Sequence, residues 1–344
     1  MRQVPLIKPD LPTFESVEQQ FREILANGRV TNFGKSVTQF EQAAGAHLGA
    51  SCVTLSSGTM GMVLTLQALG LQKGQKVILP SFTFNATGQA ILYAGGIPVF
   101  AECNDELTLD PKDLANLLSK HDNVFGVIPV HVFGLPARVD EIDEVVKAAA
   151  KRTGKPIRVI YDAAHAFGSQ RDGRKVGTFG DAEVFSLSVT KVLVTVEGGM
   201  VSSRNEDLIQ RLKKMRNWGI ESNYRSFYPG MNGKMSEFHA IVGVENLKRV
   251  DALMAERQKR ARVYADAVQQ RTSFLCCAWP SNVLHTFKDF SVMTPPRLEG
   301  KRDAVINFLK ERGVETRAYV VPPLHEQECF QSYAERALPV TAQL

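Results

Sequence analysis

The sequence has few cysteines, and none of them stands in a metal-binding arrangement. The five are Cys52, Cys103, Cys276, Cys277 and Cys329. Their number is odd and no pair has the CxxC spacing, so neither a disulfide framework nor a bound metal ion is expected. Reduced thiols are typical of cytoplasmic proteins, and the cytoplasm is therefore the expected location.

Long apolar runs are also missing. The first residues, MRQVPLIKPDLPTFESVEQ, contain no apolar core of signal-peptide length, and no later segment approaches the length that spans a bilayer. Internal repeats and low-complexity linkers are absent from the sequence. We therefore expect a soluble protein that does not bind to a membrane.

A strong charge of either sign is lacking as well. The chain has 41 Lys and Arg against 36 Asp and Glu, which gives a formal net charge of +5. The two basic clusters, RLKKMR and ERQKRAR, fit solvated faces of helices better than a nucleic-acid surface. Nucleic acid is not an expected partner, whereas an anionic small-molecule substrate would suit the mild positive charge.

What the sequence does contain is a regular alternation of apolar and amphipathic segments. Strands are expected at CVTLSS, KVILP, IPVFAEC, VFGVIPVHVFG and IRVIYDAA. Helices are expected between them, and one begins with Asp110 as N-cap and Pro111 at its first position. Continuous apolar strands separated by helices predict an α/β fold with a mostly parallel sheet that is covered on both faces.

The pattern changes in the last third of the chain. Residues 236–271 read as one long, charged helix. A strand is expected in FKDFSVMTPP, and a helix followed by a strand in KRDAVINFLKERGVETRAYVV. These segments predict a smaller α+β domain at residues 246–344, after a large domain at residues 1–245 that includes an N-terminal arm.

One lysine stands alone in an apolar run. Lys191 lies in FSLSVTKVLVTVEGG, and no other charged residue occurs between Glu183 and Glu197. One interpretation is a lysine that extends from an edge strand to solvent. The other is a lysine whose pKa is lowered by burial, so that it can form a Schiff base.

Two more polar features follow predicted strands. SSGTMGM begins a helix, where the N–H groups of Gly58 and Thr59 could hold a phosphate, although a simple tight turn explains the same residues. Asp162 ends the strand IRVIY, where it could cap a helix or pair with a protonated ring nitrogen. A phosphate turn, an aspartate and a buried lysine are together what a pyridoxal phosphate enzyme needs, and this favours the Schiff-base interpretation of Lys191.

Longer motifs are similar to one family over almost the whole length. They are SSGTMGMVLTLQALGLQKGQKVILPSFTFNAT, GGIPVFAEC, HVFGLPARVDEI, YDAAHAFGSQRDGRKVGTFGDAEVFS, TKVLVTVEGGMVSS and GMNGKMSEFHAIVG. On these motifs the chain resembles the DegT-type sugar aminotransferases, which are fold-type I pyridoxal phosphate enzymes with a seven-stranded sheet. The resemblance implies an aminotransferase that converts a nucleotide-linked keto-deoxysugar to an amino sugar. The amino donor would be L-glutamate, or else glutamine, and the cofactor would cycle through pyridoxamine phosphate.

The resemblance also implies a role for each matching cofactor residue. Lys191 would form the Schiff base and carry the proton, Asp162 would pair with the pyridine nitrogen, and His165 would lie near the ring hydroxyl. Phe84 would stack on the cofactor ring. The phosphate would be held by Gly58, Thr59 and Ser186, together with Asn232 of a neighbouring subunit. That last contact implies a homodimer with shared sites.

Substrate contacts are implied in the same way. Tyr319 and His325 of TRAYVVPPLH would face the substrate, and Ser188 would lie in its pocket, where relatives carry an aromatic residue or histidine. Lys234 stands where many relatives have arginine, a difference that would alter a charge contact. The chain stops at LPVTAQL, before the strand and helix with which relatives continue, so the small domain is expected to be shortened.

Two alternative functions stay open at this point. The altered pocket at Ser188 also suits an aminotransferase that acts on a cyclitol or another natural-product ketone. The short C-terminus and the altered pocket also suit a regulatory protein that binds pyridoxal phosphate without turnover. Sugar dehydratases of the family resemble transaminases with histidine in place of the lysine, so Lys191 argues against that activity.

Overall fold

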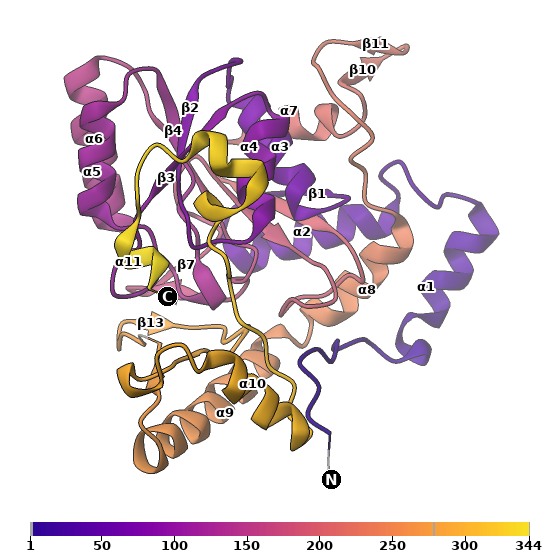
Figure 1. Cartoon of the computed structure of the whole chain (residues 1–344). Coiled ribbons are helices and arrows are strands. Elements are labelled where there is room, and N and C mark those ends of the chain that lie inside the picture. Colours follow the sequence, from indigo (N-terminus) through magenta and orange to yellow (C-terminus); the bar gives the residue numbers. More distant parts are fainter. Residues whose placement is uncertain (1–2, 278, 344) are drawn as a thin grey trace.

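A seven-stranded sheet forms the centre of the computed structural model, which describes residues 3–277 and 279–343 (Figure 1). The strand order is β1-β9-β8-β5-β4-β2-β3. The strands are β1 (Ser51–Leu55), β2 (Lys76–Pro80), β3 (Ile97–Ala101), β4 (Val124–Val127), β5 (Arg158–Asp162), β8 (Ala182–Ser186) and β9 (Gly199–Ser203). Within this sheet β9 runs antiparallel to both of its neighbours and the other pairs are parallel. The expected mostly parallel sheet is therefore confirmed.

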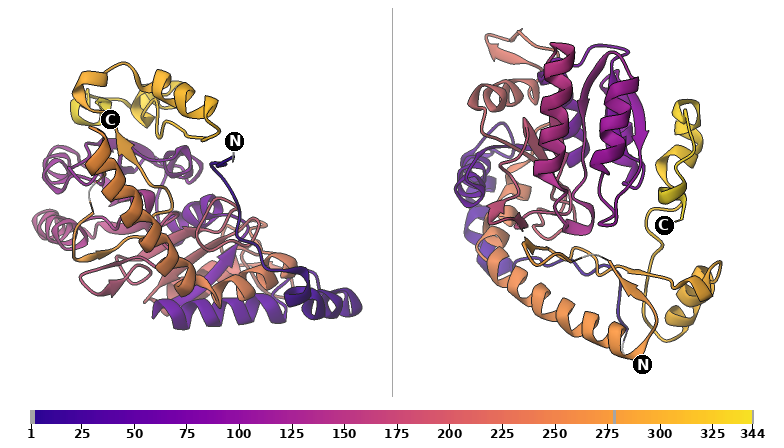
Figure 2. Two further views of the ribbon diagram at one scale, coloured as in Figure 1. Left: turned by 90° about the horizontal axis from the view of Figure 1, so that it is seen from below. Right: turned by 90° about the vertical axis from the view of Figure 1, so that its left-hand side faces the viewer.

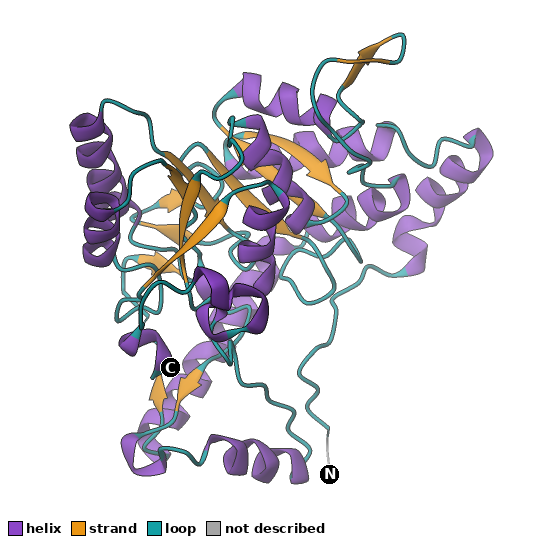
Figure 3. Ribbon diagram, turned by 45° about the horizontal axis from the view of Figure 1, so that its top comes forward, coloured by secondary structure: helices purple, strands orange, loops and turns teal. Residues whose placement is uncertain are grey.

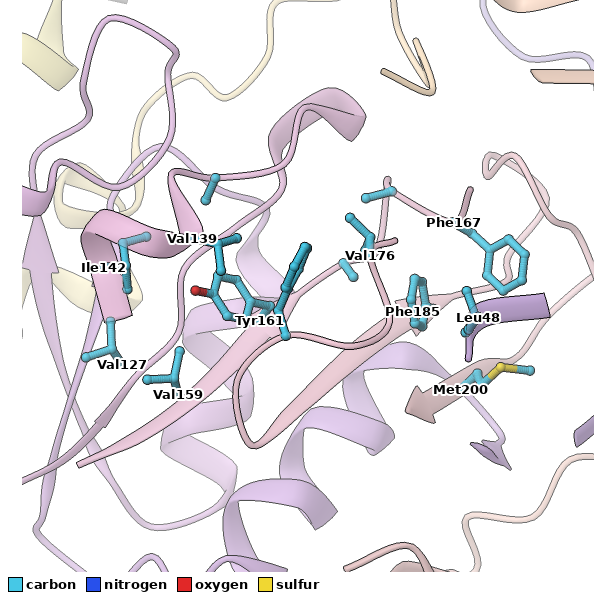
Figure 4. Close-up of a cluster of buried hydrophobic side chains, with 14 of the residues drawn as sticks. Leu48, Val127, Val139, Ile142, Val159, Tyr161, Phe167, Val176, Phe185 and Met200 are labelled. Atoms are coloured by element: carbon cyan, nitrogen blue, oxygen red, sulfur yellow. The ribbon is translucent and has the colours of Figure 1, made fainter. Parts of the chain in front are cut away.

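Helices cover both faces of the sheet (Figure 3). One face packs against α2 (Lys35–Leu48), α5 (Pro111–Lys120), α6 (Val139–Thr153) and α8 (Glu237–Leu247). The other packs against α3 (Gly58–Ala68), α4 (Asn85–Tyr93) and α7 (Glu206–Met215). Side chains alternate between the faces along each strand: in β2, Ile78 joins the first cluster whereas Val77 and Leu79 join the second. Figure 4 shows part of the first cluster, in which the Tyr161 and Phe185 rings are fully buried.

The helix at the start of the chain and several short elements complete the large region. The helix α1 (Phe14–Asn27) packs on α8, where the rings of Phe21 and Phe238 lie 4.8 Å apart. The short strands are β6 (Gln170–Arg171), β7 (Arg174–Lys175), β10 (Ile220–Ser222) and β11 (Arg225–Ser226), and the 3-10 turn η1 spans Val132–Gly134. The strands β10 and β11 form a hairpin that projects from the large region (Figure 1).

A smaller region lies below the sheet (Figure 2). Its elements are α9 (Val250–Arg271), β12 (Leu275–Cys276), β13 (Val283–Leu284), β14 (Val292–Met293), η2 (Pro296–Leu298) and α10 (Arg302–Glu311). The single long helix expected at residues 236–271 is wrong, because α8 ends at Leu247 and α9 begins at Val250. The Asn246 amide donates to the carbonyl oxygens of Asp10 and Val194, and these bonds fix the turn at which the chain changes direction.

Three expected strands are shorter than predicted. VFGVIPVHVFG contributes β4 and a single bridge at Val130, FKDFSVMTPP contributes β14, and the segment after α10 contributes a single bridge at Val314. In FKDFSVMTPP the backbone does not continue a strand at its start. The Lys288 N–H donates to Phe133 O at 3.0 Å, and Phe287 has a positive φ of 46°. An apolar segment that bonds to a loop is indistinguishable, in sequence, from one that bonds to a strand.

Both ends of the described chain pack on distant parts of the fold. Near the start, the Val4 N–H donates to Gly313 O at 2.8 Å, so the first residues pair with the smaller region. After α10 the chain returns to the sheet through η3 (Leu324–Glu326), η4 (Glu328–Tyr333) and α11 (Pro339–Ala342). Leu324, Phe330 and Leu338 join the second core cluster there. The domain division expected between residues 245 and 246 falls inside α8 and stays a prediction.

Candidate active site

Several of the predicted cofactor residues gather at the carboxyl ends of parallel strands. The strand β5 ends at Asp162, β8 ends at Ser186, and α3 begins at Gly58 just after β1. Open parallel sheets bind ligands at this edge. The sequence motifs that were far apart along the chain therefore meet at one place.

The first turn of α3 offers unpaired backbone donors. The Ser57 hydroxyl accepts the N–H of Met60 at 3.1 Å, which caps the helix and leaves the N–H groups of Gly58 and Thr59 without an intrahelical acceptor. A Cβ atom on Gly58 would lie 3.2 Å from the Ser186 Cα, so the helix begins directly against the end of β8. The positive end of the helix dipole and these donors form a site for an anion.

Gly199, the second glycine after Glu197, lies where two backbone segments come very close together. It begins β9 and pairs with both Leu55 and Ser186. A Cβ atom here would lie 2.3 Å from the backbone of Ser57, so only glycine lets the chain pass this close to the turn before α3. This structural role was not assigned from the sequence, although the EGG motif was its signal.

Asp162 is held by a short chain of hydroxyl groups. Its Oδ2 accepts a hydrogen bond from Thr87 Oγ1 at 2.7 Å, and Thr87 Oγ1 lies 2.9 Å from Thr83 Oγ1. Its Oδ1 accepts the N–H of Ala164 at 3.0 Å. Asp162 therefore caps a local turn and still presents a carboxylate to the site. Sequence reasoning missed both threonines, which lie in the SFTFNAT motif that was used only for Phe84.

A buried pair supports Asp162 from behind. The His131 N–H donates to the Asp162 carbonyl oxygen at 2.9 Å, and His131 Nε2 lies 3.0 Å from Glu183 Oε1. Both side chains are fully buried. The backbone bond from His131 fixes the end of β5, and it thereby helps to fix the position of the Asp162 carboxylate.

Lys191 lies in a loop between β8 and β9, so the edge-strand interpretation is wrong. Its neighbours Val192 and Leu193 are buried in the first core cluster and anchor the loop. Burial, and then the positive charge of Lys288, lowers the pKa of Lys191 from 10.5 to about 8, against the opposing effect of Asp162. The apolar run thus serves to bury the loop from which the lysine extends.

His165 is a neutral histidine with a defined tautomer. Its Nδ1 accepts the N–H of Phe133 at 3.1 Å, so the ring proton lies on Nε2, which is 3.3 Å from the Tyr319 hydroxyl. Burial, followed by the charges of Lys191 and Lys288, lowers the pKa of His165 well below its usual value. Tyr319 comes from the segment after α10, so the site has walls from both regions of the fold.

Lys288 and Asp289 are site residues that sequence reasoning missed. The Lys288 Nζ lies 5.8 Å from the centre of the Tyr319 ring and 2.7 Å from Asp289 Oδ2. Lys288 is only 12% exposed. The signal was an adjacent pair of opposite charges in the otherwise apolar segment FKDFSVM, which was interpreted only as a strand.

The remaining site predictions are not tested by these contacts. Phe84 precedes α4 and is 57% exposed, Asn232 is exposed, and Ser188 lies in the turn before Lys191. His325 is buried, with its Nδ1 2.7 Å from the hydroxyl of Ser81, which follows β2. Their roles toward cofactor and substrate stay predictions.

Neither a membrane-spanning helix nor a metal-binding cluster occurs in residues 3–277 and 279–343. Among these residues, no helix has both the length and the apolar character needed to cross a bilayer. In the same part of the chain, no three or more His, Cys, Asp or Glu side chains are grouped so that they could hold a metal ion.

Known proteins resemble this chain over nearly its full length. The sequence profile of the DegT/DnrJ/EryC1/StrS aminotransferase family matches residues 13–344. The chain is 29% identical to a GDP-perosamine synthase of Caulobacter vibrioides, over 98% of this chain and 89% of that protein. It is 32% identical to a UDP-N-acetyl-3-dehydro-alpha-D-glucosamine 3-aminotransferase of Acidithiobacillus ferrooxidans, over 88% of this chain and 79% of that protein.

The fold is also shared with solved structures. DesI, crystallised in the presence of its TDP-sugar product, matches with a TM-score of 0.91 at 30% identity, over 100% of this chain and 86% of that one. A putative PLP-dependent aminotransferase from Bacillus cereus matches with a TM-score of 0.89 at 27% identity, over 99% of this chain and 92% of that one. The fold expected from the sequence motifs is thereby confirmed.

Proposed function

We propose, because the chain belongs to the DegT/DnrJ/EryC1/StrS aminotransferase family, that it transfers an amino group to the keto carbon of a nucleotide-linked keto-deoxysugar. The names of the relatives above refer to GDP-, UDP- and TDP-linked compounds, which supports a nucleotide-linked acceptor. L-Glutamate is the proposed amino donor. The observation that carries the proposal is the meeting of Lys191, Asp162 and the first turn of α3 at one edge of the sheet.

The residues present fit pyridoxal phosphate. The free N–H groups of Gly58 and Thr59 suit its phosphate, the Asp162 carboxylate suits a protonated ring nitrogen, and Lys191 suits its aldehyde. When bound, this cofactor supplies an aldehyde that condenses with amines and a ring that withdraws electrons from the reacting carbon. Phe84 would cover the ring.

The protein's own groups would then move and hold protons. A lysine with a pKa of about 8 can both accept and release a proton near neutral pH, which suits Lys191 as the general acid and base. His165 stays neutral and can donate from Nε2 to an oxygen atom of a ligand or of Tyr319. Tyr319, Ser188 and His325 are the proposed substrate contacts.

A second copy of the chain is part of the proposal. The β10–β11 hairpin and its flanks expose Trp218 (47%), Tyr224 (92%) and Phe227 (52%), and Asn232 lies exposed just beyond them. Large aromatic side chains in one exposed segment are typical of an interaction surface. In a homodimer, Asn232 would reach the phosphate site of the neighbouring subunit.

Absorbance spectroscopy of the purified protein tests the function. L-Glutamate is expected to remove the visible band of the bound aldehyde form and to produce the near-ultraviolet band of the amine form. A nucleotide-linked keto-deoxysugar should then restore the visible band. Lys191→Ala should show neither change, because it has no amine at that position.

Other outcomes would redirect the proposal. Restoration by a free cyclitol ketone, with nucleotide-linked ketones inactive, would favour the natural-product alternative. Bound cofactor that neither glutamate nor glutamine converts would contradict the proposed reaction. A protein that binds no pyridoxal phosphate would overturn the assignment of Lys191.

A further inference from the structure

We propose that Lys288 binds a substrate carboxylate beside the reacting carbon, so that this site selects substrates that carry one. The proposal rests on the proposed aminotransferase function and deepens it. It concerns the segment between β13 and β14, which the sequence motifs did not connect with the site.

The segment is fixed against the catalytic loops by its backbone and by one hydroxyl group. The Lys288 N–H donates to Phe133 O at 3.0 Å. Thr286 Oγ1 donates to the carbonyl oxygen of His165 at 2.7 Å. Because the Phe133 N–H in turn donates to His165 Nδ1, these four residues form one hydrogen-bonded unit. Lys288 is therefore positioned by the same contacts that position His165.

The Lys288 side chain faces the interior of the site. It is 12% exposed, and its ammonium group lies near the Tyr319 ring, whose hydroxyl is 3.3 Å from His165 Nε2. Its charge acts on Lys191 and on His165, since it helps to lower the pKa of both. A second ammonium group thus lies within electrostatic range of the catalytic one.

Two cations, Lys288 and Arg257, lie in or beside the segment between β13 and β14. Lys288 Nζ lies 2.7 Å from Asp289 Oδ2, and the charge of Asp289 also acts on the pKa of Arg257. Arg257 Nη1 donates to Phe287 O at 2.6 Å, and its Nε is buried without a hydrogen-bond partner among the described residues. A buried donor of a cationic group without a partner is costly, and an anionic group of a substrate would offset that cost.

A carboxylate is the anion that the chemistry brings to this place. The amino donor carries its carboxylate on the same carbon as its amino group, so the carboxylate arrives within a bond length of the reacting centre. A sugar acid would bring one from the acceptor. In both cases a cation next to Lys191 and His165 is the group that can recognise it, and hydrogen bonds between ions are the stronger ones in proteins.

The test compares the holoenzyme with Lys288→Gln and Lys288→Arg, and with Lys310→Gln as control, since Lys310 is exposed on α10. Glutarate, which has no amino group to react, is the first probe, measured by calorimetry. Removal of the charge should weaken its binding roughly 10- to 100-fold. Lys288→Arg should restore most of the affinity, which a purely structural role would not require, and Lys310→Gln should bind as the wild type does.

Two further arms identify the source of the carboxylate. If it belongs to the donor, Lys288→Gln should raise the KM for L-glutamate and leave the limiting rate of the donor half-reaction nearly unchanged. If it belongs to the acceptor, the variant should lose affinity for UDP-glucuronate and keep its affinity for UDP-glucose.

The proposal is overturned if Lys288→Gln binds glutarate, L-glutamate and UDP-glucuronate as tightly as the wild type. Melting curves identify a variant that has lost its fold, and in that case Lys288→Arg alone decides, by keeping or losing carboxylate affinity. A wild type that binds glutarate through Lys288 but aminates no ketone would contradict the proposed function and leave this inference standing.

Discussion

At the residue scale, burial and the charge of another lysine lower the pKa of Lys191. Its pKa of about 8 lies well below the ordinary 10.5, with burial as the largest cause and the charge of Lys288 as the next. Below pH 8 the ammonium form dominates and cannot attack an aldehyde, whereas above it the neutral amine can. An amine with this pKa is available to act as a nucleophile at a pH where most lysines are protonated.

The first prediction follows from this pKa. The rate at which cofactor-free protein takes up pyridoxal phosphate is expected to rise through pH 8 and to level off well below the ordinary lysine pKa of 10.5. Stopped-flow absorbance measures that rate. Lys288→Gln should move the inflection to higher pH, because it removes a neighbouring positive charge. A wild-type rate that keeps rising toward pH 10.5 would contradict the assigned pKa.

The second prediction concerns the hydroxyl that holds Asp162. Thr87→Val removes the 2.7 Å hydrogen bond to the Asp162 carboxylate, and kcat is expected to fall roughly tenfold. Thr83→Val is the matched control, because it removes a similar hydroxyl but leaves the Thr87 bond in place. Steady-state kinetics on both variants tests the role. Equal losses would show that Thr87 acts through packing alone.

At the scale of the element, α2 begins on a carboxylate from another helix. Glu237 of α8 is 1% exposed and accepts the N–H groups of Gly34 and Ser36, each at 2.8 Å. The N-cap residue of α2, Gly34, has no side chain to fulfil this role. One charged group thus satisfies the orphan donors of a helix that is 200 residues away in sequence.

The third prediction is the cost of neutralising that carboxylate. Glu237→Gln should lower the free energy of unfolding by about 1.5–3 kcal/mol, since hydrogen bonds to a charged acceptor are lost in a buried place. Glu18→Gln should cost less than about 0.5 kcal/mol, because its partner Arg22 is a surface neighbour on α1. Urea unfolding measures both. Similar costs for the two variants would refute the capping role.

Elements with a local signature were predictable from sequence, and elements without one were not. Asp110 and Pro111 predicted the start of α5, and the Asp110 carboxylate caps that helix. The end of β5 at Asp162 was equally clear. By contrast, Tyr319 was placed in a strand, yet it lies in a loop whose contact, His165, is 154 residues earlier in the chain. Periodicity reports the burial of a segment and carries no information about which distant loop binds it.

At the scale of the whole molecule, the C-terminal segment packs against α4, the helix that begins directly after Phe84. The fully buried Phe330 lies against Gly88 of α4 and packs edge-on with Phe100 at 5.8 Å. A Cβ atom on Gly88 would come within 2.7 Å of the Phe330 ring. The same helix carries Thr87, so the seating of this segment and the placement of Asp162 are linked.

The fourth prediction uses that close approach. Alanine in place of glycine inside a helix is normally stabilising by about 1 kcal/mol, but Gly88→Ala should lower the melting temperature because the Phe330 ring cannot yield. Phe330→Ala leaves room for the methyl group, so adding Gly88→Ala to it should cost nothing further. Thermal melts of the two single variants and the double variant test this coupling. Additive losses would contradict it.

The pairing of Val4 with Gly313 has a mechanical consequence. The chain crosses between the sheet and the smaller region three times: before α1, between α8 and α9, and before η3 (Figure 1). A region joined to its neighbour by one chain segment can rotate about that segment. Three connecting segments restrict the movement of the smaller region against the sheet. Lys288 and Tyr319 are carried by that region. We therefore expect a substrate bound between the two regions to spend little of its binding energy on moving the smaller region against the sheet.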